Sequence, residues 1–130
     1  MDDQTLEKLR YPFGRFSFPK NITTSDIQNW INDIASMPSE LTRIVKNLDE
    51  VQLATPYRPG GWTVRQLVHH IGDSHLNSLI RFKWALTEEK PKIKAYDQNG
   101  WAEIKDFQDH SVKESLLFIQ HLHIRFTSLL

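Results

Sequence analysis

The chain has 130 residues, of which 39% are hydrophobic and 25% charged, and its formal net charge is zero. That length predicts a single domain over residues 1–130, and the neutral charge argues against binding nucleic acid or an anionic membrane surface. Because cysteine is absent, disulfides and thiolate ligands are excluded, and any bound metal must use imidazole and carboxylate groups.

The start of the chain, Met1-Asp2-Asp3, lacks the basic and apolar regions of a signal peptide. No apolar run approaches the roughly 20 residues that a membrane-spanning helix needs. We therefore predict a cytoplasmic protein with no membrane partner. Residues 1–23 mix turn-forming residues with aromatic ones, which predicts an extended arm packed on the domain, with partial disorder as the alternative. The aromatic residues of this arm are Tyr11, Phe13, Phe16 and Phe18.

The first predicted helix covers residues 24–48, with Ser25 as its N-cap and Gln28 three positions later. Its apolar residues keep a heptad-like spacing across Pro38, so we expect one kinked helix rather than two separate helices. The second predicted helix covers residues 63–89. It begins with the capping-box pair Thr63 and Gln66.

Residues 90–110 form a long polar connection, and a third helix is predicted over residues 111–130 from the capping-box pair Ser111 and Glu114. No segment alternates with the period of a strand, so the fold class is all-α. The third helix ends without the usual stop signals. Three helices with wide apolar faces leave one groove of a four-helix bundle unfilled, so we expect a fourth helix to be absent from a truncated chain or supplied by a partner.

Histidines on the second helix are the main candidates for chemistry. His69, His70 and His75 are not spaced three or four apart, so they cannot converge on one metal from this helix alone. His70 is the best candidate ligand, because it shares a face with the small side chain of Ser74. Asp73 lies close enough along the helix to orient either His69 or His70, or to act as a ligand itself. The alternative is a surface pair between His69 and Asp73, with His70 partly buried.

Other polar residues are weaker candidates. His75 is expected to face solvent or the long connection, and His121 and His123 should point to nearly opposite sides of their helix. Arg58 and Arg65 could bind an anionic group, although basic residues at the start of a helix more often form local salt bridges.

Three segments together carry a family resemblance. They are Tyr11-Pro12-Phe13-Gly14, the run Pro59-Gly60-Gly61-Trp62-Thr63-Val64-Arg65-Gln66, and the run His69-His70-Ile71-Gly72-Asp73-Ser74-His75. With them, the chain resembles the YfiT group of the DinB-like superfamily over most of its length. The resemblance implies a four-helix bundle, usually a homodimer, that binds one zinc or nickel ion through three histidines. It maps the first ligand onto His70, whereas the His-x-x-x-His pattern that supplies the other two is not found in this sequence.

The resemblance also implies a function. Members of the group are described as metal-dependent hydrolases, and close relatives as bacillithiol S-transferases, in which the metal activates water or a thiol to attack an electrophilic small molecule. Asp73 and His69 would then be neighbours of the ligand, and Arg58 or Arg65 would hold an anionic substrate group. The alternative is an inactive remnant, or a helical interaction module that a partner subunit completes.

Overall fold

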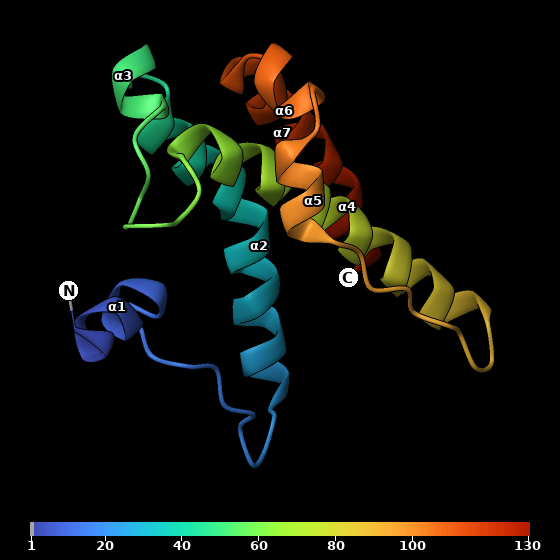
Figure 1. The fold of residues 1–130 in the computed structure, drawn as a ribbon. Coiled ribbons are helices and arrows are strands. Elements are labelled where there is room, and N and C mark those ends of the chain that lie inside the picture. The colour runs from blue at the N-terminus through green and yellow to red at the C-terminus, as the bar shows by residue number, and fades with distance from the viewer. Residues whose placement is uncertain (1) are drawn as a thin grey trace.

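The computed structural model describes residues 2–130, and these residues form helices and no strand, which confirms the all-α fold class (Figure 1). None of the described helices combines the length and hydropathy needed to cross a bilayer. The elements in chain order are α1 (Asp3–Arg10), α2 (Thr24–Val45), α3 (Glu50–Leu53), α4 (Val64–Thr87), α5 (Gln98–Glu103), α6 (Asp106–Asp109) and α7 (Val112–Leu129).

Helix α7 is the centre of the packing, since both α2 and α4 pack against it. Its residue Ile119 is completely buried. Gly72 lets α4 approach closely, because a Cβ at this position would lie only 3.0 Å from a ring carbon of Phe118 on α7. The buried apolar residues form two clusters along this helix. One contains Val45, Leu53, Val68, Val112 and Ile119, and the other Leu79, Leu122 and Phe126.

The starts of the long helices follow from local capping. At α4, Thr63 Oγ1 accepts a hydrogen bond from the Gln66 amide at 3.1 Å, and Gln66 Oε1 accepts one from the Thr63 amide at 3.0 Å. The predicted N-cap of α2 is wrong: Thr23 caps this helix in place of Ser25, because the Asp26 carboxylate accepts from the Thr23 amide at 2.8 Å. A carboxylate in the first turn also interacts favourably with the helix dipole.

Helix α2 continues through Pro38, as predicted, and bends along its length (Figure 1). Proline has no amide hydrogen and its ring crowds the carbonyl four residues earlier, which accounts for a bend at this point. The carbonyl that loses its helical partner is that of Ile34. This freed acceptor becomes part of the hydrogen-bonded cluster described below.

The N-terminal segment differs from the prediction of an extended, packed arm. Its first part is the helix α1, because Asp2 caps the Thr5 amide at 2.7 Å. The rest is extended but not packed, since Phe13, Phe16 and Phe18 are 102%, 77% and 86% exposed. Phe16 and Phe18 contact each other edge to face, with ring centroids 5.0 Å apart.

Residues 90–110 cover the first part of α4. The short helices α5 and α6 lie in this connection, and they bury Ala102 and Phe107. Gln66 Nε2 donates to the Ala102 carbonyl at 3.1 Å, which fixes α5 beside the start of α4. The connection therefore lies against one side of the helix that carries the candidate histidines.

Candidate metal site

His70 lies on α4 and is partly buried. Its ring packs against Trp62, with ring centroids 4.6 Å apart, and within residues 2–130 it makes no hydrogen bond. Burial lowers the pKa of His70, so the imidazole is neutral at pH 7 and keeps a nitrogen lone pair. A neutral imidazole with a free lone pair is the form that binds a metal ion.

His69 and Asp73 form no hydrogen bond with His70 among the described residues. His69 is buried, and its Nδ1 lies 2.5 Å from Ser115 Oγ on α7. The Asp73 carboxylate forms no hydrogen bond with either histidine among the described residues. The alternative prediction of a surface pair between His69 and Asp73 is therefore wrong. The His69 side chain turns instead toward α7, where it contacts the Ser115 hydroxyl.

A cavity of about 210 Å³ collects the polar groups on that side of α4. His69, Asp73 and Asp106 line it. Burial lowers the pKa of His69, with a further contribution from Arg65, and burial together with Asp106 raises the pKa of Asp73. Within the described chain, His69 Nε2 is buried without a hydrogen-bond partner.

A complete metal centre is not assembled by residues 2–130. Among them, no three histidine, aspartate or glutamate side chains are grouped closely enough to hold an ion. His70 fits a metal site as one nitrogen donor, but stable zinc sites in proteins use at least three protein ligands. The described residues thus provide part of a donor set and not the whole of it.

The two candidate arginines have different surroundings. Arg65 forms an ion pair with Glu50 at the start of α3, which is the local salt bridge raised above as the alternative. Arg58 instead donates from Nε to the Tyr57 hydroxyl at 2.9 Å and from Nη1 to the Pro59 carbonyl at 3.2 Å. Of the two guanidinium groups, only that of Arg58 is without a carboxylate partner in the described part of the chain.

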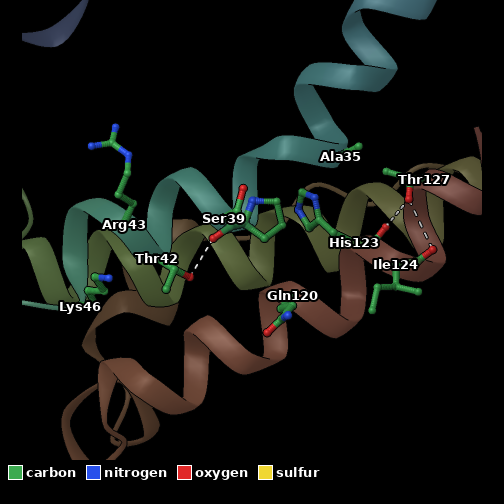
Figure 2. A pocket seen from close by; sticks show the side chains of 10 residues that line it. Ala35, Ser39, Thr42, Arg43, Lys46, Gln120, His123, Ile124 and Thr127 are labelled. Atoms are coloured by element: carbon green, nitrogen blue, oxygen red, sulfur yellow. Dashed lines mark hydrogen bonds between the residues drawn. The ribbon is translucent and has the colours of Figure 1, made fainter.

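The partly buried His75 and the buried His123 form a pair that sequence analysis missed. His75 Nδ1 lies 2.7 Å from His123 Nε2, and His123 Nδ1 lies 2.7 Å from the Ile34 carbonyl oxygen. Figure 2 shows His123 reaching from α7 toward the bend of α2 near Ala35 and Ser39. His75 therefore does not face solvent as predicted. The exposed His121 and buried His123 do point to different sides of α7, as expected.

The Ile34 carbonyl determines which ring nitrogens of His75 and His123 carry a hydrogen. A carbonyl only accepts, so His123 Nδ1 carries a hydrogen; when His123 is neutral, its Nε2 accepts from His75 Nδ1–H. His75 Nε2 is then left without a hydrogen. The cluster joins α2, α4 and α7. The sequence contains only one signal of this cluster, which is Pro38, since it frees the Ile34 carbonyl. The donor, His123, lies 89 positions away and could not be found from local spacing.

The fold and the sequence motif define the class of the protein. Residues 34–130 match the DinB superfamily, and the chain belongs to this superfamily. The resemblance noted from the sequence is confirmed.

Relatives in Bacillus cereus strain AH820 and Bacillus anthracis strain A0248 are 51% identical over 125 residues, which cover 96% of this chain and 72% of each relative. Both carry the provisional name of metal-dependent hydrolase. Among solved structures, YfiT from Bacillus subtilis aligns with a TM-score of 0.90 and 45% identity, covering 94% of this chain and 70% of that one. It is described as a probable metal-dependent hydrolase with an unusual four-helix bundle topology.

Proposed function

We propose that this protein is a metal-dependent hydrolase of the DinB/YfiT type and that His70 is one of its metal ligands. The observation that carries the proposal is the placement of the His70 imidazole, which is partly buried against Trp62 and free of hydrogen bonds among residues 2–130. The similarity to relatives named as metal-dependent hydrolases supports the reaction class.

The donor type and the family resemblance together suggest the ion. Imidazole nitrogen suits zinc, nickel, copper and iron, and because the resemblance implies zinc or nickel, we propose one of these two as the physiological metal. A bound divalent ion makes water acidic enough to supply a nucleophile at neutral pH. We propose hydrolysis of a small electrophilic molecule as the first reaction and transfer of a thiol such as bacillithiol to such a molecule as the second, since a metal also lowers the pKa of a bound thiol.

A second candidate function is a helical interaction module without catalysis. It is favoured by the incomplete donor set within residues 2–130 and by apolar side chains exposed on the long helices. Examples are Leu86 on α4, which is 66% exposed, and Ile124 on α7, which is 60% exposed. A partner surface that covers such groups would gain the free energy of burying apolar area.

Metal content separates the two candidates. Because residues 2–130 supply only part of a donor set, we expect protein dialysed with zinc or nickel at pH 7.5 to retain a measurable amount of metal, below one equivalent per chain, by elemental analysis, and we expect His70→Ala to lose it. His121→Ala is the matched control, because His121 is an exposed histidine on α7. If the unaltered protein retains no metal, or if His70→Ala retains as much as the control, the hydrolase proposal is wrong and the interaction module is favoured.

A further inference from the structure

A polar cavity of about 390 Å³ lies where the loop before α4 meets the start of α5 and the end of α1. Neither the histidine cluster nor the proposed metal ligand uses it. The residues that line it include Arg10, Arg58, Gly60, Trp62, Gln98 and Asn99.

The charge of this cavity is positive. Two guanidinium groups line it, and no carboxylate does. Elsewhere in the described chain, Arg15, Arg43 and Arg65 each pair with a glutamate. Arg10 and Arg58 form no ion pair with any described residue. The amides of Gln98 and Asn99 add uncharged hydrogen-bond donors, so the lining as a whole suits a negatively charged oxygen-rich group.

Arg58 is held in position before any ligand arrives. Its hydrogen bonds to the Tyr57 hydroxyl and the Pro59 carbonyl use Nε and Nη1, which leaves Nη2 without a partner among the described residues. The loop depends on its glycines: Gly60 has a φ of +65°, and a Cβ at Gly61 would lie 2.7 Å from Arg58 Cγ. A side chain fixed in this way loses little conformational entropy when a ligand binds.

Trp62 connects the cavity to the candidate metal ligand. Its side chain lines the cavity, and its ring lies 4.6 Å from the His70 ring. A small molecule anchored in the cavity by one end could therefore place its other end near His70.

We propose that this cavity binds a small oxyanion, a carboxylate or a phosphate group, with Arg58 and Arg10 as its cationic contacts. That the bound carboxylate or phosphate belongs to the substrate rests on the proposed function. If it does, the substrate is an anionic small molecule. Arg65, the other arginine considered from the sequence, has no part in the site because it is paired with Glu50.

The test titrates the full chain with inorganic phosphate and, separately, with acetate, and follows the Trp62 indole and His70 imidazole signals by NMR. A Trp62→Phe variant identifies the indole signal. We expect saturable shifts of both signals with at least one of the anions, and at least a tenfold weaker affinity in Arg58→Ala. Arg58→Lys should fall between the two, because lysine keeps the charge but not the planar fork.

The matched control is Arg43→Ala, which removes an exposed, paired guanidinium on α2 and should bind as the unaltered protein does. Arg10→Ala is the second variant, and it keeps the test valid if Arg58→Ala fails to fold. Absence of saturable binding, or equal affinity in the unaltered protein, Arg58→Ala and Arg10→Ala, overturns the proposal. Arg58-dependent binding in protein that retains no metal upholds the oxyanion site and removes only the metal-dependent function.

Discussion

His75 shows how burial and neighbouring histidines set the pKa of one residue. Burial, and then the neighbouring His123 and His70, lower the pKa of His75 to about 4. An exposed histidine in an unfolded chain has a pKa of about 6.5. Below pH 6.5 the unfolded chain therefore binds a proton that the folded protein does not bind until the pH approaches 4. The pKa values of His69 and His70 are shifted in the same direction.

We accordingly predict that the free energy of unfolding falls as the pH is lowered from about 6.5 to about 4, because the unfolded state binds more protons in this window. One pKa unit corresponds to about 1.36 kcal/mol, so His75 contributes up to about 3 kcal/mol of this loss. Urea unfolding at several pH values measures it. His75→Ala should show a clearly smaller loss, whereas the exposed-site control His121→Ala should match the unaltered protein. Equal pH dependence in all three proteins would contradict the prediction.

At the scale of the element, α2 and α7 are coupled by an acceptor that α2 cannot satisfy by itself. Pro38 removes the amide that would bond the Ile34 carbonyl, and His123 supplies the donor at 2.7 Å. The bend of α2 thus creates the place that His123 occupies. Because the His123 hydrogen bond replaces a missing helical one, substitutions at Pro38 and His123 should have non-additive effects on the free energy of unfolding.

A double-mutant cycle tests this coupling. His123→Ala alone leaves the Ile34 carbonyl without a partner, at a cost of about 1–3 kcal/mol in addition to lost packing. With Pro38→Ala also present, residue 38 has an amide hydrogen that can bond Ile34, so His123→Ala should cost about 1 kcal/mol less. Urea unfolding of the four proteins gives the coupling energy. The corresponding cycle of Pro38→Ala with His121→Ala should be additive, and an additive His123 cycle would disprove the coupling.

At the scale of the whole molecule, exposed apolar groups and a neutral surface favour association. Phe13, Phe16 and Phe18 lie exposed between α1 and α2, and a net charge of zero gives little long-range repulsion between copies. Large exposed aromatic side chains are common in interfaces between proteins. We therefore propose a second copy of the chain as the partner, in keeping with the homodimer expected from the sequence.

Sedimentation velocity over a range of concentrations tests the homodimer. We predict concentration-dependent formation of a dimer, and at least a tenfold weaker association in the double variant Phe16→Ser and Phe18→Ser, since it removes two exposed rings. Val51→Ser is the control, because Val51 is 78% exposed on α3, away from the phenylalanines. A monomer at every concentration would exclude the dimer, and equal weakening by Val51→Ser would place the interface elsewhere.

The sequence by itself determined the helical fold and the family, because the signals involved are local or lie in one continuous motif. Thr63 and Gln66 cap α4 across three positions, and the same holds for Ser111 and Glu114 at α7. The N-cap of α2 was misplaced by two residues because Asp26 is a stronger capping partner for Thr23 than Gln28 is for Ser25.

Only the tertiary structure decided which partner each histidine has. His69 bonds Ser115, 46 positions away, and His75 bonds His123, 48 positions away. Helical spacing orders the side chains around one helix, but it carries no information about which residues of a second helix lie opposite. The proposal of His70 as a ligand comes from its motif and stays a prediction, whereas the pairing of His75 depends on the way α4 and α7 pack and on the bend at Pro38.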